Sequence, residues 1–107
     1  MTQFDDRQKA FEKKFTHDAD LKFKAESRRN KALAEWAGAK LGLSGAEIED
    51  YVKAVRKADL AEKGDDDVFR KVKADLEAKG KGVPDMELRG VMGELLAKAV
   101  ADIEGAR

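Results

Sequence analysis

The chain has 107 residues, a formal net charge of zero and no cysteine, which fits one small domain. A general nucleic-acid binder needs a positive excess to displace counterions, so that class is not expected. Because the chain has no thiol, it cannot form a disulfide or a thiolate metal site, and cysteine catalysis is excluded. The longest apolar runs are four residues, as at 36–39, so we expect no direct membrane insertion. The start lacks the apolar core of a signal peptide, and we expect a cytoplasmic protein.

The amino-acid composition favours an all-α fold. Alanine, lysine, acidic residues and leucine dominate, valine, isoleucine and threonine are few, and there is one proline. Such a composition is typical of helices rather than of a turn-rich β-structure. A chain of this size forms one modest core and leaves any long polar arm outside it.

Residues 1–18 differ in pattern from the rest. Phe4, Phe11 and Phe15 follow one another at steps of seven and four, which places the rings on one helical stripe. Continued along the chain, that stripe meets charged side chains: Lys22, Glu26 and Arg29. We therefore expect an N-terminal arm at 1–18 that is disordered or a frayed helix when free and orders on a partner. The alternative is that the stripe folds back onto the helices as additional core.

Residues 19–107 predict a bundle. A first long helix is expected at about 19–41, closed by Gly42, with Trp36 in the core. A second is expected at about 45–62, because Ser44 and Glu47 have the spacing of a capping box. Its apolar face carries Ile48, Tyr51, Val52 and Val55.

Two further helices are expected at about 66–79 and 86–104, separated by a glycine- and proline-containing turn. Asp85 is a plausible N-cap of the last helix, and Gly90 and Gly93 within it suggest close approach of a neighbour. Four helices joined by short glycine-marked turns predict a four-helix antiparallel bundle with a flexible N-terminal arm.

Catalytic chemistry is poorly supplied. His17 is the single histidine, and a solvated arm residue or a weak pH sensor are its two interpretations. The run at 65–67 consists of three aspartates, which fits a helix N-terminus better than a calcium loop. We expect no catalytic residue, no metal site and no cofactor. An enzyme would require buried carboxylates from separate helices, such as Glu35 and Asp59, to meet in one pocket.

A basic cluster supplies an alternative function. Arg28, Arg29 and Lys31 lie close together in the sequence and could hold an anion such as a nucleotide phosphate. The interpretation without a ligand is a solvated helix face with charge pairs one turn apart. The alternative to a protein-binding arm is therefore a helical nucleotide- or anion-binding sensor.

Several strings resemble a known family. They are residues 4–7 (FDDR), 23–30 (FKAESRRN), 35–37 (EWA), 64–71 (GDDDVFRK) and 75–77 (DLE). In this order, and over essentially the whole chain, they resemble the zeta subunit of the alphaproteobacterial F-type ATP synthase. The last helix matches that family in length and apolar spacing more than in sequence.

The resemblance implies a small noncatalytic inhibitor of ATP hydrolysis with a four-helix fold. Its partner would be the catalytic head of the synthase, and its location would be cytoplasmic, peripheral to the inner membrane through that complex. The inhibitory element of the family is the N-terminal segment, which becomes helical in an interface between catalytic subunits. Carried over to this chain, the partner-binding residues are Phe4, Asp5, Asp6, Arg7, Phe11, Lys13, Lys14 and Phe15.

Overall fold

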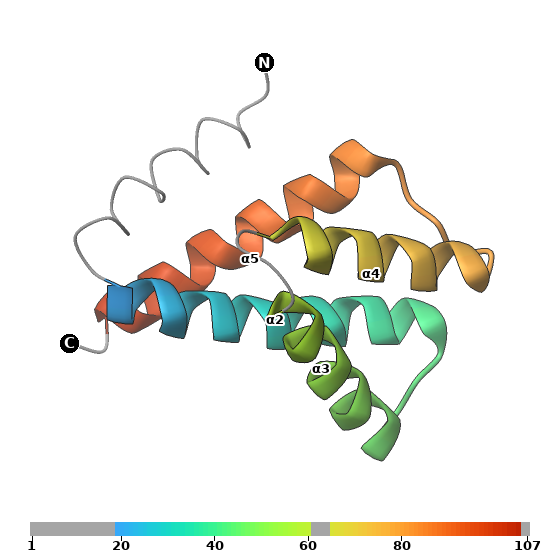
Figure 1. The fold of residues 1–107 in the computed structure, drawn as a ribbon, viewed down its shortest axis with the longest axis horizontal. Coiled ribbons are helices and arrows are strands. Elements are labelled where there is room, and N and C mark those ends of the chain that lie inside the picture. Colours follow the sequence, from blue (N-terminus) through green and yellow to red (C-terminus); the bar gives the residue numbers. More distant parts are fainter. Residues whose placement is uncertain (1–18, 61–64, 106–107) are drawn as a thin grey trace.

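The computed structural model describes residues 19–60 and 65–105, and the predicted arm at 1–18 lies outside them. The all-α prediction is confirmed, because the described residues form four helices and no strand (Figure 1). The helices are α2 (Ala19–Leu41), α3 (Ala46–Asp59), α4 (Asp66–Ala78) and α5 (Asp85–Gly105).

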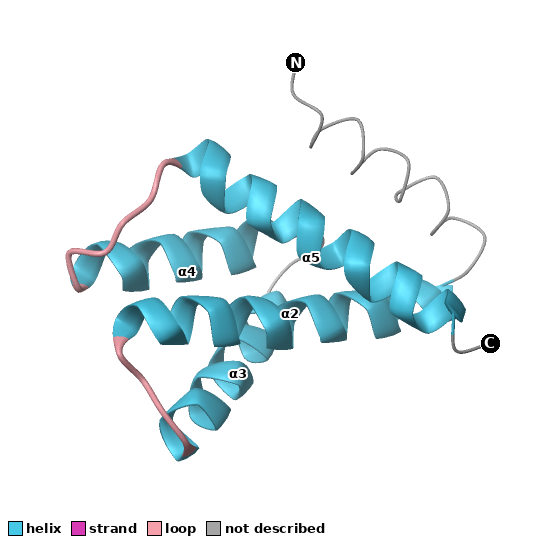
Figure 2. Ribbon diagram, turned by 180° about the vertical axis from the view of Figure 1, so that it is seen from behind, coloured by secondary structure: helices cyan, strands magenta, loops and turns pink. Residues whose placement is uncertain are grey.

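Helix α2 is the central element. Helix α5 runs alongside it in the opposite direction, and α3 and α4 pack against it from two other sides (Figures 1 and 2). The chain thus forms two hairpins, α2–α3 and α4–α5, each closed by a short loop. This is the predicted antiparallel arrangement, with α3 crossing α2 at an open angle.

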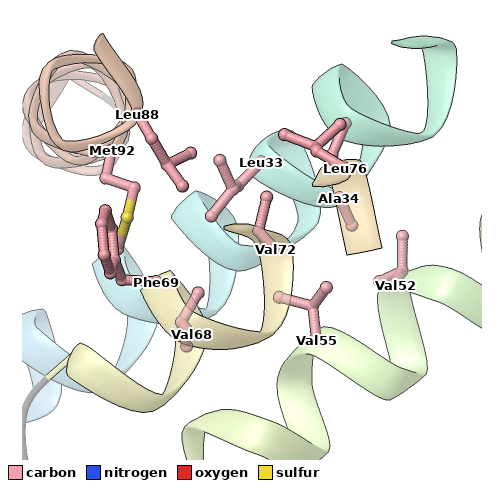
Figure 3. Close-up of a cluster of buried hydrophobic side chains, with 11 residues drawn as sticks. Leu33, Ala34, Val52, Val55, Val68, Phe69, Val72, Leu76, Leu88 and Met92 are labelled. Carbon is pink, nitrogen blue, oxygen red and sulfur yellow. The ribbon is translucent and has the colours of Figure 1, made fainter. Parts of the chain in front are cut away.

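A main hydrophobic core joins all four helices (Figure 3). Leu33 and Ala34 of α2 meet the apolar faces of α4 and α5, while Val52 and Val55 of α3 close the opposite side. The remaining buried members are Ala37, Val68, Phe69, Val72, Leu76, Leu88 and Met92. The three- and four-residue spacing that predicted each helix therefore also predicted most of this core.

A second, smaller core joins the start of α2 to the end of α5. Leu21 and Ala25 pack with the last turns of α5, which bury Leu96, Ala99, Val100 and Ile103.

Glycines end two of the helices. Gly42 and Gly80 have φ of 79° and 69°, the left-handed region that L side chains rarely adopt. After each, a backbone N–H donates to a carbonyl five residues back, Leu43 N to Gly38 O at 2.9 Å and Lys81 N to Leu76 O at 2.8 Å. These are Schellman turns. The predicted closure of the first helix at Gly42 is confirmed.

Some local predictions are wrong. No side chain caps α3, whose N-cap is Gly45 with a φ of 56° rather than Ser44, so the predicted capping box with Glu47 does not form. Close approach at Gly93 is also absent, because a Cβ there would meet nothing within 4 Å. A close approach does occur at Gly38, where a Cβ would lie 3.3 Å from Ile48 Cδ1.

Two aromatic side chains of α2 are not fully buried in the core. Phe23 is 70% exposed, although it lies among the apolar residues of the helix. Trp36, predicted as core, is partly buried against the main cluster, with Lys40 Nζ 5.0 Å from the centre of its ring.

Candidate functional site

The predicted partner-binding residues lie outside the described residues. They are Phe4, Asp5, Asp6, Arg7, Phe11, Lys13, Lys14 and Phe15. Their role stays a prediction of the sequence.

The predicted basic cluster does not form one surface. Arg28 and Lys31 are exposed, whereas Arg29 is 1% exposed. Consecutive residues of a helix point about 100° apart, so Arg29 faces the interior while Arg28 and Lys31 share the outer face. An anion site built from all three would require Arg29 to leave the interior. Anion binding by this cluster stays a prediction.

Arg29 is the centre of a buried polar network. Its Nε donates to Asn30 Oδ1 at 2.8 Å, and its Nη1 lies 3.5 Å from Asp65 Oδ2. Its Nη2 lies 3.9 Å from Asp59 Oδ1 and has no hydrogen-bond partner among the described groups. Asn30 Nδ2 in turn donates to Asp59 Oδ2 at 2.9 Å. The network therefore ties α2 to the end of α3 and the start of α4.

Asp65 extends the network to α5. Arg89 Nη1 donates to Asp65 Oδ1 at 3.1 Å, and Arg89 Nη2 donates to Asp66 Oδ1 at 2.6 Å. The hydrogen bond and charge of Arg89 lower the pKa of Asp66. The guanidinium of Arg89 also stacks 4.1 Å from the centre of the Phe69 ring. Asp65 occupies the N-cap position of α4 but its side chain makes no capping hydrogen bond; it contacts Arg29 of α2 and Arg89 of α5 instead.

The sequence carries one signal of this network, although the spacing of charged residues along the chain does not predict it. Arg29 lies four residues after Ala25 and four before Leu33, on the line of buried side chains that also includes Leu21 and Ala37. A charged residue on a core stripe requires buried partners of opposite charge. Arg29 is therefore distinguished from Arg28 and Lys31 by its helical position and not by its place in the sequence.

A cavity of about 340 Å³ lies beside this network, between α2 and the end of α3. Its residues follow helical spacing on both sides, so one face of each helix forms a wall. The α2 wall consists of Phe23, Glu26, Ser27 and Asn30, and the α3 side of Arg56, Asp59 and Leu60. The buried Asn30 and the half-buried Asp59 give the cavity a polar interior, whereas Phe23 and Leu60 are exposed.

Glu26 is the electrostatically unsatisfied group of the cavity. Burial raises the pKa of its carboxyl, and the lowering by Arg29 is opposed by Asp59. No Lys or Arg of the described ranges forms an ion pair with it; the cations that act on it, Arg29 and Lys22, do so at longer range. The cavity therefore holds a half-buried carboxylate that lacks a direct cation.

Other polar contacts are structural in character. Tyr51 donates its hydroxyl to Asp75 Oδ2 at 2.8 Å, and burial together with this carboxylate raises the pKa of Tyr51. Glu35 is exposed, so it does not meet Asp59 in a pocket. Within 19–60 and 65–105, no group of three or more metal-ligating side chains is placed to hold an ion, and no helix is long and apolar enough to cross a bilayer.

Comparison with known proteins shows the family to which the sequence is similar. Residues 1–102 match the family described as ATPase inhibitor subunit zeta. The match spans the predicted arm and all but the last turn of the four helices. A comparison with individually curated proteins gives no match.

Proposed function

The chain belongs to the ATPase inhibitor subunit zeta family, and we propose that it is a noncatalytic subunit that inhibits ATP hydrolysis by the catalytic head of the F-type ATP synthase. The observation that carries the proposal is the family match, which includes the arm as well as the helices. Membership in an inhibitor family indicates a regulatory role. In this proposal the protein lies at the periphery of the membrane, because it binds the synthase there.

The inhibitory element in this proposal is the arm at 1–18. Phe4, Phe11 and Phe15 bury their rings in a cleft of the head, which contributes about 1.5–3 kcal/mol for each ring that is fully covered. Ordering the arm costs about 1–2 kcal/mol per backbone residue fixed, so further contacts must add to the binding energy. Arg7, Lys13 and Lys14 set register and specificity through charge pairs.

In this proposal, the helices form the folded core and the arm at 1–18 makes the inhibitory contact. Among the described residues, side chains of α2 to α5 form two hydrophobic cores, one shared by all four helices and one shared by α2 and α5. In this proposal the arm at 1–18 takes no part in either core and is available to a partner. Inserted between catalytic subunits, it would block their cycle as a wedge, without chemistry of its own.

The test is ATP hydrolysis by the purified cognate head, titrated with the full chain and with a chain lacking residues 1–18. We expect the full chain to inhibit and the shortened chain to lose inhibition while keeping its helical circular dichroism. Equal inhibition by both chains would refute the arm as the inhibitory element. Absence of inhibition by the full chain would refute the proposed function.

A further inference from the structure

Exposed apolar side chains gather at the cavity between α2 and α3. The large hydrophobic side chains that stand exposed in the described ranges are Phe23 at 70%, Leu60 at 82% and Met86 at 65%. Phe23 of α2 and Leu60, which directly follows α3, both line the cavity from different sides. Single exposed apolar residues are ordinary, but a pair that converges on one hollow is typical of an interaction surface.

The polar side of the same cavity specifies charge. Its lining contains two carboxylates, Glu26 and Asp59, and one cation, Arg56. Asp59 is held by Asn30 and Arg29, whereas Glu26 has no such contact in the described structure. Because burial without a direct counter-ion costs free energy, a cation brought to Glu26 would be bound favourably. An anion would meet the uncompensated carboxylate and be repelled.

The occupant that satisfies both sides has an apolar stem and a positive tip. A lysine or arginine side chain has this form, since its methylene groups pack on apolar surface while its charge stays at a polar end. We propose that the cavity docks a basic side chain of the ATPase head, with its stem between Phe23 and Leu60 and its cation at Glu26. This inference rests on the proposed function and adds a second contact to it.

The position of the cavity favours the same partner as the arm. Phe23 lies four residues after Ala19, the first residue of α2, which is about 6 Å along a helix. An arm inserted in the head would therefore bring the first turns of α2 next to that surface. Two linked contacts bind more tightly than either alone, because the second forms at high effective concentration.

The experiment measures the affinity of the full chain for the purified head at low and high salt, with four variants. We expect Phe23→Ala and Glu26→Gln each to weaken binding by about tenfold, and Glu26→Lys to weaken it more. The loss in Glu26→Gln should shrink at high salt because salt screens its charge, whereas the loss in Phe23→Ala should persist. Met86→Ala is the matched control, since Met86 is equally apolar and exposed but lies on α5, outside the cavity.

The outcomes separate this inference from the proposed function. If the unaltered chain binds and inhibits while Phe23→Ala and Glu26→Gln bind equally well, the docking site is refuted and the inhibitor role stands. Tighter binding by Glu26→Lys would show that the cavity meets an acidic partner and would overturn the proposal. Failure of the unaltered chain to bind the head would refute both. Melting temperatures of all variants exclude loss of folding as the cause of weak binding.

Discussion

Arg28 and Arg29 are neighbours in sequence with opposite surroundings. Arg28 is exposed, whereas Arg29 is buried between Asp59 and Asp65. Removing one partner of a buried ion pair leaves uncompensated charge, and that costs far more than the pair contributes when intact. Stability at this site therefore depends on keeping all members of the network.

Replacement of the two arginines by alanine should separate these roles. Arg29→Ala should lower the free energy of unfolding by about 3–5 kcal/mol, because Asp59 and Asp65 lose their shared cation. Arg28→Ala should change it by less than about 0.5 kcal/mol. Urea denaturation followed by circular dichroism measures both. Equal values for the two variants would contradict the buried network.

Glu26 should make stability fall as pH rises. Burial raises the pKa of its carboxyl above the ordinary 4.5, so the folded chain binds this proton more tightly than the unfolded chain. As the pH rises above 4.5, ionisation of this carboxyl therefore lowers the free energy of unfolding. At lower pH the carboxyl is protonated in both states and this loss disappears. Glu26→Gln should raise the melting temperature at pH 7, and the gain should vanish at about pH 3. Glu87 is exposed, so the control variant Glu87→Gln should show no such pH-dependent gain. An unchanged melting temperature of Glu26→Gln at pH 7 would contradict this account, because it would show that the Glu26 carboxylate is well solvated.

At the scale of the elements, helix ends depend on backbone conformation that the sequence shows only in part. The Gly42 and Gly80 turns follow from the preference of a helix end for glycine. The start of α3 does not, because Gly45 takes a positive φ and displaces Ser44 from the N-cap position. Two competing start signals, one at Ser44 and one at Gly45, cannot be ranked from spacing alone.

Two glycine substitutions should have opposite signs. Gly80→Ala should lower the free energy of unfolding by about 1 kcal/mol or more, because its φ of 69° is strained for a side chain. Gly93→Ala should raise it by up to about 1 kcal/mol, since Gly93 lies inside α5 with open space beside it. Thermal melts of the two variants beside the unaltered chain give both signs. A destabilised Gly93→Ala chain would mean that α5 is packed more closely at this point.

At the scale of the whole molecule, local periodicity predicted the helices but not what lies between them. Leu33, Val55, Val72 and Leu88 lie in the main core, and each repeats the three- and four-residue spacing of apolar residues in its own helix. The Arg29 network and the cavity depend on how the end of α3 and the start of α4 meet α2, which spacing within one helix does not contain. The exposure of Phe23 belongs to the same case, because spacing within α2 does not show that this face of the helix opens into the cavity.

The proposed two-part organisation is the central claim: in it, four helices bury their own core, and the arm finds its hydrophobic surroundings in the ATPase head. Backbone amide hydrogen exchange of residues 1–18, in the free chain and in its complex with the purified head, tests it most directly. The account predicts fast exchange in the free chain and strong protection in the complex, with α2 to α5 protected in both. Protection of residues 1–18 already in the free chain, unchanged by the head, would contradict it.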